Sequence, residues 1–503
     1  MTDALLTALT NVAAPTVLLA LMLGVVVGVI IGALPGLSAT MGMAIFSPAT
    51  FFLPPVEGIS FLLALYKGGT FGGSLSAILI GTPGTASNAA TVADGYAMTR
   101  AGQAGRALGL AVWGSVVGDG IGILALVLCA PLVAEFALQV GNAEKFAITF
   151  MSLTLVAYVS GASLMKGLFA ASIGLALSLV GTDPIGGSPR LTFGIRELSA
   201  GIGVIPLAIG LFGLAEVLDQ LARWRPGRME PPTVEVPLLR DILHRLWQVK
   251  RTIARSSLIG ASIGALPGIG SETSNWVAYA LARRASKTPE AFGRGADEGV
   301  VAPEVACNAT CGAALIPTLI FGIPGDIVTS ILMGALIAQG LQPGPTLITD
   351  NTGLFYTLYA GLFVSMVMLA FVGLAAMRFA SRIILIPRPL LFTAVAVLCV
   401  AGTYAINARL FDVGVMVLAG FAGWGMRALR IPVAPLVLAF VLGGILEDSF
   451  RRMLIQSRGS LSPLWDRPIA LGVCLVTLAV IAFALKGTLT DRFRNRTAET
   501  STE

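Results

Sequence analysis

The chain has 503 residues, of which 55% are hydrophobic and only 12% are charged, and its formal net charge is +6. A soluble protein is typically about 45–50% apolar and about 25% charged, so this composition excludes a soluble protein. The basic residues lie in connections between apolar runs, which argues against a nucleic-acid-binding surface.

Long uncharged stretches follow one another along the chain, at residues 4–56, 68–93, 146–165, 305–325 and 351–377. A helix that crosses the hydrocarbon core needs about 20 predominantly apolar residues, and within lipid its backbone must be satisfied internally. The runs are too long, and alternate too little, for barrel strands. We therefore predict an all-α polytopic membrane protein with about eleven or twelve transmembrane helices.

Basic residues are concentrated in a central connection, residues 222–255, and near the C-terminal spans. The positive-inside rule places these segments on the cytoplasmic side. Arg451 and Arg452 conflict with this assignment, because the alternation of spans puts them outside. The expected location is the bacterial inner membrane, in a multi-pass arrangement.

Two motifs recur in the same order, which predicts two related halves. Ile-Gly-Ala-Leu-Pro-Gly occurs at residues 31–36 and again at 263–268, an offset of 232 positions. Gly-Thr-Pro-Gly at 81–84 corresponds to Gly-Ile-Pro-Gly at 322–325, an offset of 241 positions. The dipeptide Glu-Gly keeps the second offset, at residues 57–58 and 298–299.

Each recurring motif places Pro-Gly inside a run long enough to span the membrane. Proline removes a backbone donor and glycine tolerates unusual dihedrals, so the helix is expected to break or turn back there. The expected segments are a first transmembrane repeat, 1–221, with broken helices at 32–36 and 81–84; a basic cytoplasmic linker, 222–255; the core of a second repeat, 256–350, with broken helices at 264–268 and 322–325; C-terminal scaffold helices, 351–486; and a cytoplasmic tail, 487–503.

Paired broken helices in two halves are the pattern that marks the binding site of a secondary transporter. Broken helices at membrane depth are tolerated where they are buried in protein or line a watery cavity. Half-helix N-termini carry partial positive charge and free N–H groups, which suit a carboxylate. The alternative for any single glycine is close helix packing, with proline making a structural kink.

Polar and ionisable residues around the four breaks are the predicted site; no catalytic residue and no metal site is predicted. The predicted substrate-binding residues are Gly32, Pro35, Gly36, Ser38, Thr40, Lys67, Thr82, Pro83, Gly84, Thr85, Ser87, Asn88, Pro267, Gly268, Ser271, Thr273, Asn275, Pro324 and Gly325. The predicted cation-coupling residues are Glu272, Glu304, Asn308, Asp326 and Thr329.

Several of these residues have an equally good structural interpretation. Lys67 is placed either against a substrate carboxylate or against an internal acid, and Asp119 either in transport or in a structural pair. Glu304 and Asn308, one helical turn apart, suit an ion site or an interhelical hydrogen bond. Asp94 is consistent with a loop or helix cap.

The longer motifs resemble the large membrane subunit of tripartite tricarboxylate transporters. The resemblance is carried by residues 28–37, 66–84, 94–98, 104–109, 304–309 and 314–325, and it covers nearly the whole chain. Cys307 departs from the family pattern, in which a second Asn beside Asn308 is expected.

The resemblance implies a three-part system in which this chain is the permease, together with a small membrane subunit of about four helices and a periplasmic solute-binding protein. It also implies import of citrate and other carboxylates driven by a Na⁺ or H⁺ gradient, without ATP and without a cofactor other than the coupling cation. An elevator-like movement of the broken-helix core is expected by the same analogy.

The leading hypothesis is therefore a binding-protein-dependent carboxylate–cation symporter embedded in membrane lipid. An ion or solute channel independent of a binding protein is the alternative, and the two-fold repeat suits a transporter better. A membrane-embedded enzyme is a third class. No buried histidine cluster, Gly-x-Ser-x-Gly elbow or P-loop occurs, so we expect neither a hydrolase nor an ATP-driven pump.

Overall fold

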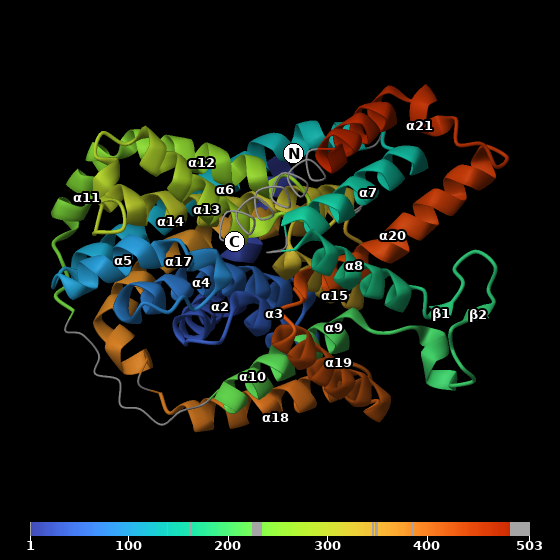
Figure 1. Cartoon of the computed structure of the whole chain (residues 1–503), viewed down its shortest axis with the longest axis horizontal. Coiled ribbons are helices and arrows are strands. Elements are labelled where there is room, and N and C mark those ends of the chain that lie inside the picture. Colours follow the sequence, from blue (N-terminus) through green and yellow to red (C-terminus); the bar gives the residue numbers. More distant parts are fainter. Residues whose placement is uncertain are drawn as a thin grey trace, which may run out of the picture. The chain divides into compact units, whose positions relative to one another are not determined.

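The protein is almost wholly helical in a computed structural model that describes residues 2–137, 139–159, 163–223, 234–344, 347, 351–384 and 386–482 (Figure 1). The predicted tail, 487–503, and the middle of the predicted linker, 224–233, lie outside the described residues. The chain forms two compact units, residues 1–137 with 202–430 and residues 138–201 with 431–503.

The first unit contains the elements that carry all four Pro-Gly segments. Those from its N-terminal part are α1 Thr2–Val12, α2 Pro15–Ala33, α3 Ala39–Phe46, η1 Pro48–Phe52, α4 Pro55–Ile80, η2 Ala86–Asn88, α5 Thr91–Arg100 and α6 Ala104–Ala137. Those that follow residue 201 are α9 Val204–Ala208, η4 Ile209–Leu214, α10 Ala215–Arg223, α11 Leu239–Gln248, α12 Lys250–Gly264, α13 Gly270–Ala285, η5 Pro289–Ala291, α14 Asp297–Ala313, η6 Pro317–Phe321, α15 Ile327–Ala338, α17 Thr352–Ile384, α18 Arg388–Asn407 and α19 Leu410–Ala428.

The second unit is smaller and contains the only β-structure among the described residues, a two-stranded antiparallel hairpin. Its elements are α7 Asn142–Val159, α8 Leu164–Ser178, β1 Gly181–Thr182, β2 Pro189–Arg190, η3 Arg196–Ala200, α20 Ala434–Gln456, α21 Pro463–Asp466 and an apolar helix Pro468–Ala482. Helix α20 packs against α7 and α8. Because residues 138–201 group with 431–503, the units cut across the predicted segments, whose boundaries remain predictions.

Seven helices in the described part of the chain are long and apolar enough to cross a membrane, which confirms an all-α polytopic membrane protein. They are Pro15–Ala33, Ala104–Ala130, Val204–Arg223, Asp297–Phe321, Thr352–Phe379, Pro389–Asn407 and Leu410–Ala428. Shorter apolar helices of 10–17 residues are Ala39–Phe52, Leu164–Ser178, Ile327–Ala338 and Pro468–Ala482. Breaks shorten the apolar helices near them, so the expected count of eleven or twelve spans stays a prediction.

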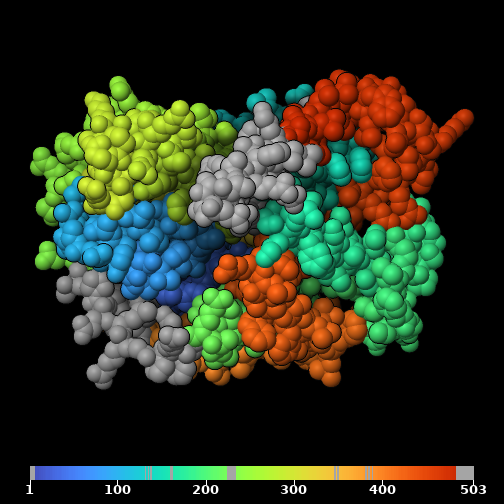
Figure 2. Space-filling model, in the orientation of Figure 1, coloured from blue at the N-terminus to red at the C-terminus, as the bar shows by residue number. Residues whose placement is uncertain are grey.

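Helix α4 is the centre of the first unit. It is 26 residues long, and all but five of its residues, namely 55–57, 61 and 80, are buried. It packs against α2, α3, α5, α6, α14, α15 and α17. Figure 2 shows residues from the two predicted halves, in blue and in yellow-green, sharing one continuous surface of this unit, in agreement with the contacts of α4 and α6 with α14.

Glycines bring the helix backbones of α2 and α4 almost into contact. A Cβ atom added at Gly28 would lie 2.4 Å from the Leu65 carbonyl oxygen. At Gly260 of α12 the added atom would lie 2.3 Å from the Ala306 carbonyl oxygen of α14. Gly28 and Gly260 are 232 positions apart, and Leu65 and Ala306 are 241 apart, so one contact recurs at both sequence offsets. One helical turn further along, the same close approach occurs between Gly32 and Gly69 in the first half and between Gly264 and Thr310 in the second.

We predict that Gly28→Ala destabilises the protein by about 1–3 kcal/mol, the usual cost of overpacking a tight contact. The measurement is thermal unfolding of the purified chain in detergent, together with its abundance in membranes. Gly425→Ala in α19 is the matched control, because nothing lies within 4 Å of its added Cβ. Equal melting temperatures for the two variants would contradict the importance of this contact.

Candidate functional site

The first Pro-Gly segment of each half ends one helix and starts another. Gly36 lies between α2 and α3 with a φ of +91°, and Gly268 lies between α12 and α13 with a φ of +87°. Left-handed backbone of this kind is available to glycine at little cost, which explains the residue type. The Ser38 side chain then caps α3 by accepting a hydrogen bond from the Met41 amide at 3.1 Å.

The second Pro-Gly segments are matched in the same way. Gly81 ends α4 with a φ of +69°, and Gly322 ends the π-helical turn η6 with a φ of +67°. A left-handed residue at a helix C-terminus is the usual way to stop a helix. All four predicted breaks are therefore present as interruptions of helices.

Within each half the two breaks contact each other. The Gly84 backbone packs so closely on Gly32 that an added Cβ would lie 1.9 Å from the Gly32 carbonyl oxygen. In the second half, the Gly268 amide donates a hydrogen bond of 2.8 Å to the Gly325 carbonyl oxygen. In the second half, a backbone amide at one break is thus satisfied by a carbonyl at the other, as burial at membrane depth requires. In the first half, the Gly84 amide instead donates to the Gly73 carbonyl oxygen of α4 at 3.3 Å.

A break of one half also contacts a break of the other. The hydroxyls of Ser87 and Ser271 are 2.8 Å apart, and the Asn275 amide donates to the Ala86 carbonyl oxygen at 3.1 Å. The Oδ1 atom of Asn275 is buried and has no hydrogen-bond partner among the described residues. The start of α13, with its half-helix N-terminus, therefore faces the segment 85–88.

The start of α15 is a capping box built on a buried carboxylate. The Asp326 Oδ1 atom accepts from the Thr329 amide at 2.7 Å, and the Thr329 hydroxyl accepts from the Asp326 amide at 2.8 Å. The Tyr66 hydroxyl of α4 donates to Asp326 Oδ2. A Cβ added at Gly270 would lie 3.1 Å from the Asp326 Cβ, so the start of α13 lies beside this carboxylate.

Thr85 and Asn88 occupy the corresponding positions of the first half, 241 residues before Asp326 and Thr329. The Thr85 hydroxyl donates to Asn88 Oδ1 at 2.5 Å, and both side chains are buried. The first half thus has a neutral pair where the second has a carboxylate. Of these matched positions, only Asp326 supplies a negative charge.

Glu304 of α14 is a fully buried carboxylate that links five elements. Its Oε2 atom accepts from the hydroxyls of Ser74 at 2.6 Å and Ser115 at 3.1 Å. Its Oε1 atom accepts from the Thr91 hydroxyl at 2.6 Å and the Asn88 amide at 3.3 Å. All four donors are neutral, so they solvate the carboxylate without cancelling its charge.

Asn308 lies apart from the Glu304 carboxylate although it follows it by one turn. Its amide donates back to the Glu304 backbone carbonyl at 2.9 Å, within the same helix. The two predicted coupling groups of this turn are therefore not brought together by their side chains.

Lys67 of α4 is paired with an internal acid. Its Nζ atom is 2.8 Å from Asp119 Oδ2 and donates to the Leu362 carbonyl oxygen at 2.7 Å and to the Ser365 hydroxyl at 3.2 Å. Both ionised side chains are buried. Any direct contact of Lys67 with a substrate would have to displace Asp119.

The remaining predicted residues differ in accessibility. The partly or fully exposed ones are Pro35, Gly36, Ser38, Thr40, Thr82, Pro83, Ser87, Gly268, Glu272 and Thr273. The buried ones are Gly32, Gly84, Thr85, Asn88, Pro267, Ser271, Asn275, Pro324 and Gly325. The accessible set lies on the break segments and their adjoining helix starts.

Sequence reasoning did not single out four side chains that complete these contacts: Tyr66, Ser74, Thr91 and Ser115. Ser115 is one turn before Asp119 on α6, and Tyr66 is adjacent to Lys67 on α4. The helix faces on which these two residues lie could therefore be inferred from the sequence. Thr91 carried no such signal, because its partner Glu304 is far away in sequence.

Asp94 of α5 holds a loop of the second half. Its Oδ1 atom accepts from the amides of Gly293, Gly295 and Ala296 at 2.8–2.9 Å, and its Oδ2 atom accepts from the Tyr279 hydroxyl at 2.8 Å. Asp94, for which the sequence suggested a loop or helix cap, instead links α5 with α13 and with the loop that precedes α14.

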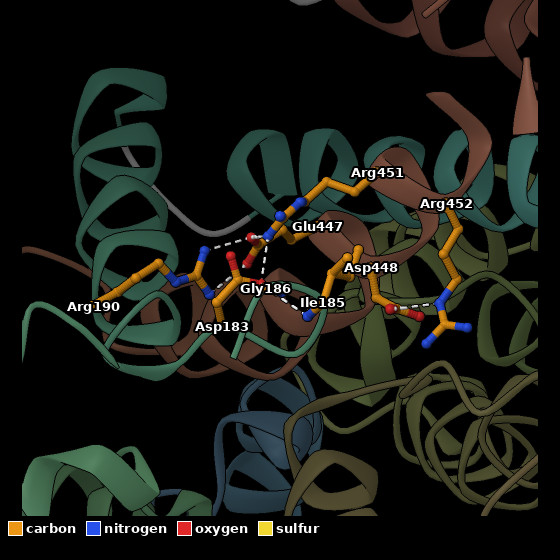
Figure 3. Close-up of polar contacts among 8 residues, drawn as sticks. All are labelled: Asp183, Ile185, Gly186, Arg190, Glu447, Asp448, Arg451 and Arg452. Carbon is orange, nitrogen blue, oxygen red and sulfur yellow. Dashed lines mark hydrogen bonds and ion pairs between the residues drawn. The ribbon is translucent and has the colours of Figure 1, made fainter. Parts of the chain in front are cut away.

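A separate ion cluster anchors the hairpin of the second unit to α20 (Figure 3). Arg190 makes two contacts with Glu447, at 2.5 and 3.1 Å, and Arg451 contacts both Asp183, at 2.8 Å, and Glu447, at 3.0 Å. The amides of Ile185 and Gly186, together with Arg451, lower the pKa of Asp183 to about 2. A carboxyl group whose pKa is lower in the folded than in the unfolded protein stabilises the fold at pH values above its unfolded pKa. The contact of Asp183 therefore weakens only as the pH falls toward about 2.

We predict that Asp119→Asn lowers the stability by about 3–5 kcal/mol, because it leaves the Lys67 ammonium buried without a counter-charge. Replacing both partners by apolar residues, Lys67→Met with Asp119→Leu, should recover most of the loss. Thermal unfolding in detergent measures both effects. A single variant as stable as the unmodified chain would show that Lys67 finds another partner.

We predict that Glu447→Gln exposes the hairpin to proteolysis, because both Arg190 and Arg451 lose their shared carboxylate. The measurement is the rate of tryptic cleavage after Arg190 or Arg196 in the purified chain. Asp448→Asn is the matched control on the same helix, since Asp448 pairs only with the more exposed Arg452. Equal cleavage rates for the two variants would contradict an anchoring role.

Comparisons with known proteins identify the family of the chain. The model of the tripartite tricarboxylate transporter TctA family matches residues 18–438. An uncharacterised 52.8 kDa protein in the TAR-I ttuC' 3' region of Agrobacterium vitis is 36% identical over 459 residues, which are 90% of each chain. An uncharacterised protein in the TAR-II ttuC' 3' region of that organism is 35% identical over 226 residues, 45% of this chain and 93% of its own. No solved structure matches the chain. Because the family model matches most of the length of this chain, the chain belongs to the tripartite tricarboxylate transporter TctA family.

Proposed function

We propose that this chain is the large permease subunit of a secondary transporter that imports a small di- or tricarboxylate by symport with Na⁺ or H⁺. The contact between breaks of opposite halves, Ser87 with Ser271 at 2.8 Å, carries the proposal. Broken helices paired across two halves are where secondary transporters bind substrate. Membership of a transporter family supports the same role.

The substrate anion binds at the start of α13, near the segment 85–88. The first N–H groups of a helix have no partner within it and attract negative charge. Ser271 and Thr273 add hydroxyl donors, and the unpartnered Oδ1 atom of Asn275 is free to accept a hydrogen bond from a substrate hydroxyl or to bind a cation. In the first half, Ser38 and Thr40 at the start of α3 are the nearby hydroxyl groups, each one position away from the exact counterpart of Ser271 or Thr273.

Charge balance requires that a cation accompany the anion. Glu272 lies in the first turn of α13 and Asp326 lies beside it, so a bound carboxylate meets negative charge there. Na⁺ or H⁺ at Asp326 with Thr329, or at Glu304, offsets that charge. Without a cation, moving an anion inward against a negative-inside potential costs about 2.3 kcal/mol per charge per 100 mV.

The tripartite description of the family supports two proposed partners. A periplasmic binding protein delivers the carboxylate to the outer side of the inner membrane, and a small membrane subunit of about four helices accompanies the permease. The broken-helix core then carries its load inward.

The test is uptake of radiolabelled citrate, tartrate and terephthalate into proteoliposomes that contain this chain and the small subunit. The binding protein is added outside, and a Na⁺ or an H⁺ gradient is imposed in turn. We expect uptake that needs the binding protein and one of the gradients. Flux that ignores both would identify a channel and overturn the proposal.

We predict that Ser271→Ala reduces the uptake efficiency at least about tenfold, because a hydrogen bond to a charged group contributes about 1.5–3 kcal/mol. Ser172→Ala on the exposed side of α8 is the control and should leave uptake unchanged. Normal abundance and melting temperature of both variants separate a binding defect from a folding defect. Unchanged uptake by Ser271→Ala would exclude this serine from the substrate site.

A further inference from the structure

Helix α11 packs one side of itself on the first turns of the span α6. Ile242 and Leu246 are only 2% and 5% exposed. A Cβ added at Gly109 of α6 would lie 2.8 Å from Ile242 Cδ1, so the isoleucine fills the space above that glycine. Figure 1 shows α11 at the edge of the first unit, near the start of α12. Because α6 begins at Ala104, α11 lies at the N-terminal end of this candidate span.

A second apolar stripe on the same helix is about half exposed or more among the described residues. Leu239, Leu243 and Trp247, spaced by four residues, are 47%, 47% and 67% exposed. At about 100° per residue, this stripe directly adjoins that of Ile242 and Leu246. The two stripes form one continuous apolar face, of which the protein covers only one side. The polar residues of α11 occupy the opposite side, and they are Arg240, Asp241, His244, Arg245 and Gln248.

Unpaired basic side chains lie on α11 itself and on the adjoining first turns of α12. Arg240, Lys250, Arg251 and Arg255 are exposed, and none has a carboxylate within 4 Å among the described residues. Lys250 Nζ lies 4.1 Å from the centre of the Trp247 ring. The nearby Arg245 and Arg106 differ, because both contact Asp297, at 3.2 and 2.6 Å.

We propose that α11 and the first turns of α12 form an interfacial binding site for anionic phospholipid. Leu239, Leu243 and Trp247 enter the boundary between headgroups and acyl chains. Arg240, Lys250, Arg251 and Arg255 bind the phosphate groups. An amphipathic helix with one apolar and one basic face lies in the plane of such an interface, and adjacent Lys and Arg favour anionic lipids. The site does not depend on the identity of the transported solute.

Lipid is favoured over a protein occupant for two reasons on this helix. The exposed stripe continues a face that already packs at the end of a membrane span, where lipid is the surrounding medium. The unpaired charges of Arg240, Lys250, Arg251 and Arg255 are all positive, which complements a surface of phosphates. Apolar residues alone would suffice for packing against another helix.

The test places a fluorophore on the apolar stripe of the full-length chain in vesicles. Leu243→Cys is labelled after Cys129 and Cys474 are replaced by serine, since the other three cysteines are buried. Asp241→Cys, on the polar side of α11, is the matched control. Vesicles are pure phosphatidylcholine or its equal mixture with phosphatidylglycerol, each with and without lipids brominated on the acyl chain.

We expect bromine to quench the label at position 243 several-fold more than the label at 241, with stronger quenching in the anionic vesicles. Changing Arg240, Lys250, Arg251 and Arg255 together to glutamine should abolish the effect of phosphatidylglycerol but keep the difference between the two positions. Each basic residue near an anionic surface changes the affinity about fivefold, so the loss is readily measured. High salt should weaken the same effect.

Equal quenching at both positions in both lipids would overturn the proposal. So would quenching at position 243 that disappears when the small membrane subunit is reconstituted with the chain, because that result would identify a protein occupant.

Discussion

The architecture of the first unit depends on one constraint, that backbone groups released inside a membrane must be bonded within the protein. Four helices are interrupted by Pro-Gly, and the described bonds show how some of their free groups are satisfied. The Gly268 amide binds the Gly325 carbonyl oxygen, and Asp326 and Ser38 cap the helices that follow. Such bonds form only if the breaks lie together at one depth. The constraint that permits broken helices therefore also gathers them into a site.

Close helix packing is the second requirement, because breaks can contact only if their helices approach. The glycines of α2 and α12 allow this approach in both halves, at Gly28 on Leu65 and at Gly260 on Ala306. The Thr70 hydroxyl and the Cys311 sulfur, 241 positions apart, contact each other at 3.4 Å. Residues at matched positions of the two predicted halves therefore touch where α4 packs against α14. The interpretations of glycine as a packing residue and as a break are thus both correct, at different glycines.

The sequence was sufficient to predict the fold class, because apolar length and Pro-Gly placement are local properties. It was sufficient to predict the four breaks for the same reason. The partners of the buried charges could not be predicted, since Lys67 with Asp119 and Glu304 with Thr91 join helices whose packing no local pattern specifies. The grouping of residues 138–201 with 431–503 is also a tertiary property. Asp94 shows the limit most clearly, since its amide partners follow it by about 200 positions.

The buried charges Lys67, Asp119, Glu304 and Asp326 divide into two kinds, and the division bears on coupling. Lys67 and Asp119 neutralise each other, so the pair can remain ionised in every state of a transport cycle. Glu304 and Asp326 receive hydrogen bonds from neutral donors, which stabilise a carboxylate but leave its charge uncompensated. A carboxylate in a medium of low polarity gains most from binding a proton or a metal cation. Under the proposed function, coupling therefore resides in Glu304 and Asp326, and Lys67 holds the three helices α4, α6 and α17 around them.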